Sequence, residues 1–438
     1  MKRVFFAVLL LMALLLSGCQ MRTVDQMYAV PRRSAEYEEL QKAIDRVMTN
    51  LEYSAPLSGE NRQSVQMADL DGDGEEEYLL FARGNSDIPL KIFIFTKRGD
   101  GYDLMQTIES RGSAFEQVEY VDIDGTGGRE LVVGRQVSDQ VLRYLSVYTF
   151  SGSEAQRLMA VNYVRFAVSD LDEDGRSDLV ILSSGEADSD SGAAVLYHYE
   201  DGTMVRSREV RMSAQSDNIK RIMVSRIHGG KQAVYVASSV DESAIITDVL
   251  TIKDGEFTNI TLSNESGTSV QTMRNHYIYA ADIDSDGTLE LPSLIEMLPV
   301  QNNVQSAEQH LIRWYALTEH GGEIDKLHTF HNFDGGWYMT LDELWASRIS
   351  VIQQGSVCTF YVWDEAFEKA EKLLSVYAMT GSRREMEAEE SSRTVLYKTE
   401  DVVYAAKLEV AVLSYGLSEE KVLGSFHLIQ MDWKNGET

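Results

Sequence analysis

A short acidic motif recurs four times along the 438-residue chain, each time directly before a run of apolar residues. The copies read ADLDGDGEEEYLLF, VDIDGTGGRELVVG, SDLDEDGRSDLVIL and ADIDSDGTLELPSL. The first three begin about 50 residues apart, and the fourth follows after about twice that spacing. The segment VSRIHGGKQAVYVA lies in the gap, with Arg226 and His228 where the first two aspartates would stand. A period of this length indicates a chain built from repeated structural units.

Each acidic motif leads into an apolar strand and then into a hairpin pattern, with alternating apolar and polar residues around a turn rich in Gly or Asp. Seven such hairpins can be recognised, from LKIFIFTKRGDGYDLMQTIE to VAVLSYGLSEEKVLGSFHLI. Units of about four antiparallel strands favour a β-propeller over a linear β-solenoid, whose repeats are much shorter. We therefore expect an all-β fold, a β-propeller over residues 54–438. Seven blades are the favoured number, with six or eight as alternatives.

The N-terminus has the features of an export signal. Lys2 and Arg3 precede an apolar run that ends in Leu-Ser-Gly-Cys at residues 16–19. This order resembles the lipobox of bacterial lipoproteins. The resemblance implies a signal peptide over residues 1–18, cleavage before Cys19 and lipidation of its thiol. An ordinary secretory signal with an incidental cysteine is the alternative, and both interpretations predict export.

A lipidated Cys19 would anchor the protein to a membrane. The expected location is the outer face of the bacterial cytoplasmic membrane, or the outer membrane in a cell that has two membranes. A polar tether over residues 19–33 and an amphipathic helix over residues 34–53 should follow, since apolar residues recur there at helical spacing. The helix could pack on the main domain or act as a spacer, and the sequence does not decide between them.

The formal net charge of −29 argues against nucleic acid as a partner, because phosphate backbones are bound by surplus Lys and Arg. Much of the negative charge lies in the four acidic motifs, which indicates cation binding instead. The only cysteine besides Cys19 is Cys358, so no internal disulfide is expected once Cys19 is lipidated. Cys358 lies in an alternating strand pattern and is expected to be a small buried residue.

The spacing of the acids in the motif suits a metal ion. In the first copy Asp69, Asp71 and Asp73 occupy positions 1, 3 and 5, and a glycine follows at position 6. Alternate carboxylates in a tightly curved loop can converge on one hard cation such as Ca²⁺, which binds about six to eight oxygens. An EF-hand would need a Glu at position 12, where this motif has Leu80. All four copies instead carry an acid at position 9, the first being Glu77. A solvated acidic turn is the alternative for any single copy.

A loop of the form D-x-D-x-D-G-x-x-[DE] before an apolar strand resembles the FG-GAP/VCBS family of propeller repeats, found in integrin α-subunit heads and many bacterial surface proteins. The resemblance covers residues 60–300, whereas residues 300–438 share only the hairpin rhythm. It implies up to four structural Ca²⁺ sites, each completed by a backbone carbonyl at position 7. The second site, with Thr126 in place of an aspartate, should be the weakest. The implied ligands are Asp69, Asp71, Asp73, Glu75 and Glu77; Asp122, Asp124, Thr126, Gly128 and Glu130; Asp170, Asp172, Asp174, Arg176 and Asp178; and Asp282, Asp284, Asp286, Thr288 and Glu290.

No sequence motif typical of a hydrolase nucleophile, an ATP-binding loop or a dinucleotide fold is present, and no catalytic residue is assigned. The only local histidine cluster contains His328, His331 and Asp334, for which packing or surface roles are the preferred interpretation. Nearby aromatic residues could belong to the core or form a sugar-binding or protein-binding surface: Trp337, Tyr338 and Trp345.

These features favour an exported, lipid-anchored and calcium-stabilised propeller that binds an unknown protein or carbohydrate without catalysis. A hydrolase or lyase acting on polysaccharide is the alternative, because propellers also host such chemistry. A role in envelope assembly is the third interpretation. Carboxylates and histidines converging at the channel mouth would favour an enzyme, whereas an exposed aromatic or apolar patch would favour a binding module.

Overall fold

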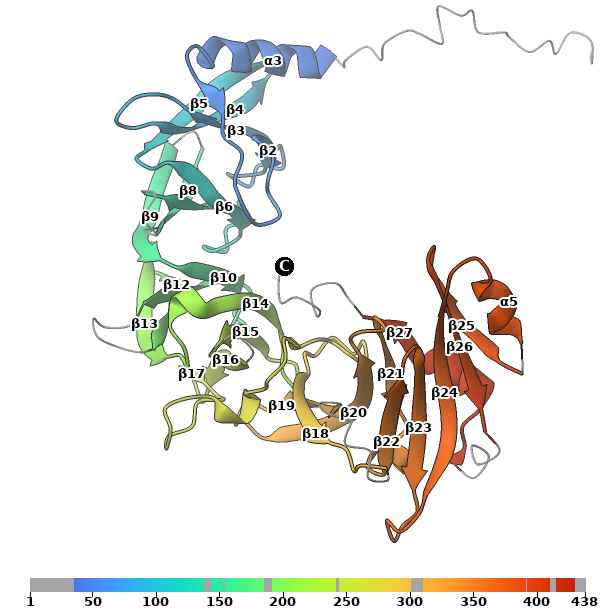
Figure 1. Cartoon of the computed structure of the whole chain (residues 1–438). Coiled ribbons are helices and arrows are strands. Elements are labelled where there is room, and N and C mark those ends of the chain that lie inside the picture. Colours follow the sequence, from blue (N-terminus) through green and yellow to red (C-terminus); the bar gives the residue numbers. More distant parts are fainter. Residues whose placement is uncertain are drawn as a thin grey trace, which may run out of the picture.

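The structure is a computed structural model that describes residues 35–137, 143–152, 154–184, 191–241, 244–300, 310–390, 392–409 and 415–429. The predicted signal peptide, Cys19 and the tether lie outside these residues. Among the described helices, none is long and apolar enough to cross a membrane. The described residues form six antiparallel sheets of four or five strands each, which follow one another along the chain (Figure 1). This order of consecutive antiparallel sheets is that of a β-propeller, and the predicted all-β fold class is confirmed.

The first four sheets are meanders in which each strand pairs with the strand that follows it. Strand β1 adds a short pairing to β3 in the first sheet. The first sheet contains β1 (Glu52–Tyr53), β2 (Val65–Ala68), β3 (Glu77–Arg83), β4 (Leu90–Arg98) and β5 (Gly101–Ser110). The second contains β6 (Ala114–Val121), β7 (Glu130–Gln136), β8 (Arg143–Ser151) and β9 (Glu154–Tyr163). The third contains β10 (Arg165–Ser169), β11 (Asp178–Ser184), β12 (Gly192–Glu200) and β13 (Thr203–Arg211). The fourth contains β14 (Ile219–Arg226), β15 (Gln232–Ser239), β16 (Ile245–Lys253) and β17 (Glu256–Asn259), with short helices η1 (Ser216–Asn218) before it and η2 (Val270–Thr272) after it.

The last two sheets depart from this order. The fifth contains β18 (Leu291–Glu296), β19 (His310–Leu317), β20 (Glu323–Asn332), β21 (Trp337–Leu341) and β27 (Phe426–Leu428). The sixth contains β22 (Ile349–Gln354), β23 (Val357–Trp363), β24 (Ala370–Thr380), β26 (Val402–Leu408) and β25 (Thr394–Lys398), and the short helix α4 (Glu343–Ala346) precedes it.

The seven-blade count is not confirmed, because the described residues contain six sheets. The seventh predicted hairpin begins at residues 410–414, which lie outside the described residues. Its second half is not a strand, because it forms helix α6 (Glu419–Ser425), followed by β27, which joins the fifth sheet. The Ser418 side chain accepts a hydrogen bond from the amide of Lys421, 3.3 Å away, and thereby caps the helix. Acidic residues in the first turn favour the helix further through its dipole.

Neighbouring sheets pack face to face through apolar cores. The core between the first two sheets includes Phe81 and Phe115, whose rings meet edge to face with centroids 5.1 Å apart. Similar cores join the second sheet to the third, the third to the fourth, and the fifth to the sixth. Cys358 is buried in the last of these, as predicted from its strand pattern.

Helices cover the two outer faces of this row of sheets. Leu40 and Ile44 of helix α3 (Ala35–Val47) pack on Leu80 and Phe93 of the first sheet. Helix α5 (Arg384–Glu389) packs Ala388 against the last sheet. In a closed ring these two faces would pack against each other. Among the described residues no strand of the first sheet pairs with one of the last, and Figure 1 shows the sheets along an open arc. Helices α3 and α5 therefore cover the faces of the first and last sheets that would pack against each other in a closed ring.

The predicted helix over residues 34–53 is shorter than expected, because α3 ends at Val47 and residues 52–53 form β1. Asn50 adopts a left-handed backbone conformation with φ of 61°, which is typical of the chain just after a helix end. The helix packs on the main domain, so the spacer alternative is wrong.

Candidate metal centres at the blade junctions

The acidic loops lead into β3, β7, β11 and β18, and the pairing across the loop base is the same in all four copies. The residue before position 1 pairs with the position-9 acid in each case: Ala68 with Glu77, Val121 with Glu130, Ser169 with Asp178 and Ala281 with Glu290. This register closes each loop and fixes the backbone at both of its ends. In the fourth repeat the pairing continues to Arg226, the position-1 residue, which pairs with Gln232. The turn of this repeat is therefore shorter than the four acidic loops, and it also lacks their carboxylates.

The position-9 acids are buried, with at most 3% of their surface exposed. Each accepts a hydrogen bond from the position-2 amide of its own loop. These bonds run from Leu70 to Glu77 (3.0 Å), Ile123 to Glu130 (2.7 Å), Leu171 to Asp178 (3.0 Å) and Ile283 to Glu290 (3.1 Å). A carboxylate can accept about four hydrogen bonds, so each acid retains capacity for a further partner.

The position-1 and position-3 carboxylates accept amide hydrogen bonds within the loop. Asp69 accepts from Gly72 at 2.8 Å and from Gly74 at 3.0 Å, and Asp71 accepts from Asp73 at 3.3 Å. Asp and Asn side chains make such bonds in many turns. These bonds therefore explain the shape of the loop but do not by themselves indicate a metal.

Carboxylate oxygens from positions 1, 3 and 9 converge in every loop and lie within 4.8 Å of one another. Oxygens at about 2.3–2.6 Å from a calcium ion have separations of this size. Among the described residues, the four acidic loops are the places where three potential ligand side chains meet in this way. The groups are Asp69, Asp71 and Glu77; Asp122, Asp124 and Glu130; Asp170, Asp172 and Asp178; and Asp282, Asp284 and Glu290.

The electrostatics of these groups fit a bound cation. Burial, reinforced by the neighbouring aspartates, raises the pKa of Glu77, Asp178 and Glu290 to about 7. Burial also raises the pKa of Glu130. The Oε1 atom of Glu290 is buried and accepts no hydrogen bond from the described residues. A divalent ion would supply a partner for that atom and positive charge for all four groups.

The position-5 residues lie outside the convergent groups, and their predicted role as ligands stays a prediction. The carboxylate of Asp73 accepts the amide of Glu75 at 2.8 Å. The carboxylate of Asp174 binds the Arg176 guanidinium, with 2.8 Å between Oδ2 and Nε. The predicted carbonyl ligands at position 7 stay predictions.

A lysine that the sequence gave no reason to select enters the fifth-sheet loop. The Nζ atom of Lys326, on β20, lies 3.4 Å from Asp284 Oδ2 and 3.8 Å from Glu290 Oε1, and it is ion-paired with Asp286. This pairing lowers the pKa of Asp286 to about 2. The ammonium group of Lys326 would therefore compete with a metal ion at this loop. Among the described ion pairs, the other three acidic loops have no lysine.

Backbone hydrogen bonds link these loops to the neighbouring blades. The position-8 amide of Arg129 donates to the position-1 carbonyl of Asp69 at 3.0 Å, and Ser177 donates to Asp122 at 2.7 Å. Leu289 donates at 3.1 Å to Arg226, the residue predicted to stand at position 1 of the altered repeat. Each acidic loop is therefore also part of the junction between two blades.

The histidine cluster does not form a group of three potential metal ligands among the described residues. His328 and His331 both lie on β20, and residues three apart on a strand point to opposite faces. The His331 ring is buried and stacks on Tyr338 with centroids 4.9 Å apart, and burial lowers its pKa to about 3. Trp337 and Trp345 are buried in the core between the fifth and sixth sheets. The packing interpretation is therefore correct for His331 and for both tryptophans.

No protein-family model matches the chain, and no curated protein matches its sequence. Similar solved structures include the Dos1 propeller, with 10% identity, TM-score 0.29 and 81% of each chain covered. The β-propeller domain of the Trilobed protease from Pyrococcus furiosus has 12% identity and TM-score 0.28, over 72% of this chain and 89% of that one. A rhamnogalacturonan lyase from Bacillus licheniformis has 13% identity and TM-score 0.29, over 74% and 72%. At such low TM-scores these likenesses carry no argument about function, and the FG-GAP/VCBS resemblance depends on the loop residues alone.

Proposed function

We propose that the protein is an exported, lipid-anchored propeller of the FG-GAP/VCBS kind that binds a protein or carbohydrate ligand without catalysis. Calcium ions in the acidic loops would stiffen the junctions between its blades. The observation that carries this proposal is the convergence of three carboxylates in loops that also hydrogen-bond to the neighbouring blade. An ion that binds only the folded form stabilises it by mass action, which is a structural role.

A hollow of about 710 Å³ supports the binding role. Its walls include the first strands of the second, third and fourth sheets, β6, β10 and β14. Figure 1 shows β6, β10 and β14 toward the concave side of the arc and β9 and β13 toward its convex side. The hollow is lined by charges of both signs, including Glu119, Arg143 and Arg165. Its volume falls in the range of about 300–1,000 Å³ that is usual for ligand sites.

Calorimetric titration of the metal-free protein with calcium tests the structural role. We expect three or four ions per chain, and a melting temperature that rises with calcium and falls again in a chelator. Magnesium at equal concentration is the control, because it binds poorly to sites that are not octahedral. A melting temperature that is the same in calcium and in chelator would contradict the proposal.

The anchoring part is tested at Cys19. Cys19→Ala should abolish incorporation of radiolabelled fatty acid and release the protein from membranes. Cys358→Ala is the matched control, because Cys358 is buried in the core and should leave labelling unchanged. Labelling that survives Cys19→Ala would contradict the lipid anchor.

The alternative function, a polysaccharide hydrolase or lyase, is favoured by one observation in the hollow. Glu119 is half-buried there, and burial raises the pKa of its carboxyl group. A carboxylic acid with a raised pKa can act as a general acid in glycoside cleavage. Release of reducing ends from a polysaccharide by the native protein, lost in Glu119→Gln, would support this alternative over the binding module. Absence of release from acidic and neutral polysaccharides would support the binding module.

A further inference from the structure

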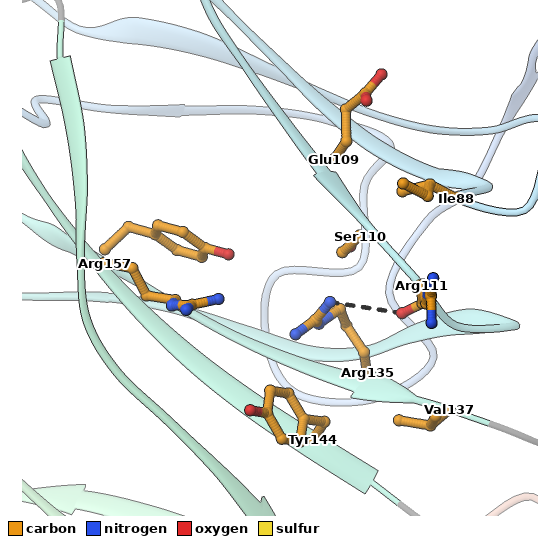
Figure 2. Close-up of a pocket in the computed structure, with 9 residues that line it drawn as sticks. Ile88, Glu109, Ser110, Arg111, Arg135, Val137, Tyr144 and Arg157 are labelled. Carbon is orange, nitrogen blue, oxygen red and sulfur yellow. Dashed lines mark hydrogen bonds between the residues drawn. The ribbon is translucent and has the colours of Figure 1, made fainter.

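A second cavity, of about 350 Å³, lies between the first and second sheets and is lined by three arginines (Figure 2). Arg111 follows β5, Arg135 lies on β7 and Arg157 lies on β9. None of these residues belongs to an acidic loop or to the hollow of the proposed function. Three cations at one cavity are unexpected in a chain with a net charge of −29.

Arg135 forms the buried part of this cavity, with 7% of its surface exposed. Its guanidinium donates to the hydroxyl of Ser146 at 2.9 Å and to the carbonyl of Arg111 at 3.4 Å. It also lies over the ring of Tyr144, 5.4 Å from the centroid. All of these partners are uncharged, and no described carboxylate pairs with Arg135. Burying a charge without a counter-ion is costly, so a cation of this kind indicates a site for an anion.

The groups around Arg135 do not neutralise it. Figure 2 shows the guanidinium of Arg157 directed toward that of Arg135. Among the described ion pairs, none involves Arg157 or Arg111. Glu109 is the only carboxylate in the lining, and it is ion-paired with Lys91. The three arginines of the cavity are therefore available to bind an anionic ligand.

The remaining lining residues indicate that the ligand has a ring as well as a negative charge. The partly buried rings of Tyr144 and Tyr148 form one part of the wall, and the apolar side chains of Ile88 and Val137 are exposed near it. The volume is at the lower end of the range for ligand sites, about 300–1,000 Å³, which suits a molecule with a single ring. Guanidinium groups bind carboxylates through paired hydrogen bonds, and aromatic rings offer a flat face for the ring of the ligand.

The geometry points to a binding site for a carboxylate-bearing ring, the chemistry of a uronic acid residue. Arg135 and Arg157 hold the carboxylate, and the two tyrosines contact the sugar ring. Arg111 lies at the other side of the cavity in Figure 2, where it contributes further positive charge. This site shares no residue with the acidic loops or with the hollow that contains Glu119. Binding at this site therefore does not depend on calcium binding or on catalysis in the hollow.

Isothermal titration calorimetry of the calcium-loaded protein with glucuronate tests the site, with calcium held constant in every arm. Glucose is the control for the carboxylate, and inorganic phosphate is the control for the ring. We expect binding of glucuronate, no detectable binding of glucose, which lacks the charge, and about tenfold weaker binding of phosphate, which lacks the ring that contacts the two tyrosines. Absence of glucuronate binding, or equal binding of phosphate, would overturn the proposal.

Arg157→Gln is the decisive variant, because Arg157 is exposed and its replacement leaves the buried Arg135 in place. We expect about tenfold weaker glucuronate binding with an unchanged melting temperature. Arg98→Gln, an exposed arginine of the first sheet paired with Asp103, is the matched control and should bind like the native protein. Arg135→Lys keeps the charge but removes the planar guanidinium, and it should also weaken binding. Native affinity in Arg157→Gln would overturn the assignment.

Discussion

The backbones of Gly72 and Gly128 lie against each other where the first and second acidic loops meet. A Cβ atom on Gly128 would lie 2.7 Å from the carbonyl oxygen of Leu70, and one on Gly72 would lie 2.9 Å from the amide nitrogen of Gly128. No side chain fits at either place. The two glycines therefore set how closely the first two blades approach, so the first two acidic loops are part of the contact between these blades.

Gly128→Ala should destabilise the protein by roughly 1–3 kcal/mol, the usual cost of forcing an extra methyl group into a packed site. Urea denaturation in the presence of calcium measures this change. Gly101→Ala is the control, because a Cβ atom on Gly101 meets no atom within 4 Å. Equal unfolding midpoints for the two variants would show that the loop contact is not a constraint.

The repeats and their acidic loops could be predicted from the sequence because both depend on local patterns. Alternating residues and turn glycines mark hairpins, and the position of Glu77 relative to Asp69 follows from the hairpin register. The altered fourth repeat could also be found by spacing, and the hydrogen bond from Leu289 to Arg226 supports that alignment.

The remaining features depend on contacts between segments far apart in the chain. Whether the final repeat forms a hairpin is decided by the cap at Ser418 and by the pairing of β27 with β21, which lies far earlier in the sequence. Lys326 reaches a loop that begins more than 40 residues before it, and no local motif marks it. In the sequence Arg135 is an ordinary strand residue, and only the packing of the first two sheets places it beside a cavity.

Glu77→Gln should remove one calcium ion from the stoichiometry and reduce the rise in melting temperature caused by calcium. Glu77 is the buried carboxylate of its group, so its loss takes away both a ligand and a negative charge. Calorimetry and thermal melts check both effects. Glu76→Gln is the matched control, since Glu76 is the exposed neighbour and belongs to no group. If the two variants bind the same number of ions, position 9 is not a ligand.

The stabilisation by calcium should increase between pH 5 and pH 7.5. The folded protein holds the pKa of Glu77, Asp178 and Glu290 at about 7, above their ordinary values of 4.5, 3.8 and 4.5. Between those values the metal-free folded state binds more protons than the unfolded state, so its free energy of unfolding falls as pH rises. Calcium replaces the protons and offsets this loss, and protons compete with it at pH 5.

The measurement is the difference between melting temperatures in calcium and in chelator at each pH. The difference cancels the opposite contribution of His331, whose lowered pKa makes both forms more stable as pH rises toward 6.5. A calcium-induced shift that is constant across this pH range would argue against the buried position-9 acids as ligands.

Lys326→Met should have effects of opposite sign with and without calcium. In the metal-free protein the ammonium group neutralises the fifth-sheet acids, so its removal should lower the melting temperature. In calcium the same removal takes away a repulsive charge beside the ion, worth about 1–4 kcal/mol for unit charges about 4 Å apart, so affinity should rise by roughly fivefold or more. Lys369→Met, an exposed lysine paired with Glu371, is the control and should change neither quantity. Unchanged calcium affinity in Lys326→Met would mean that the ammonium group lies away from the ion when calcium is bound.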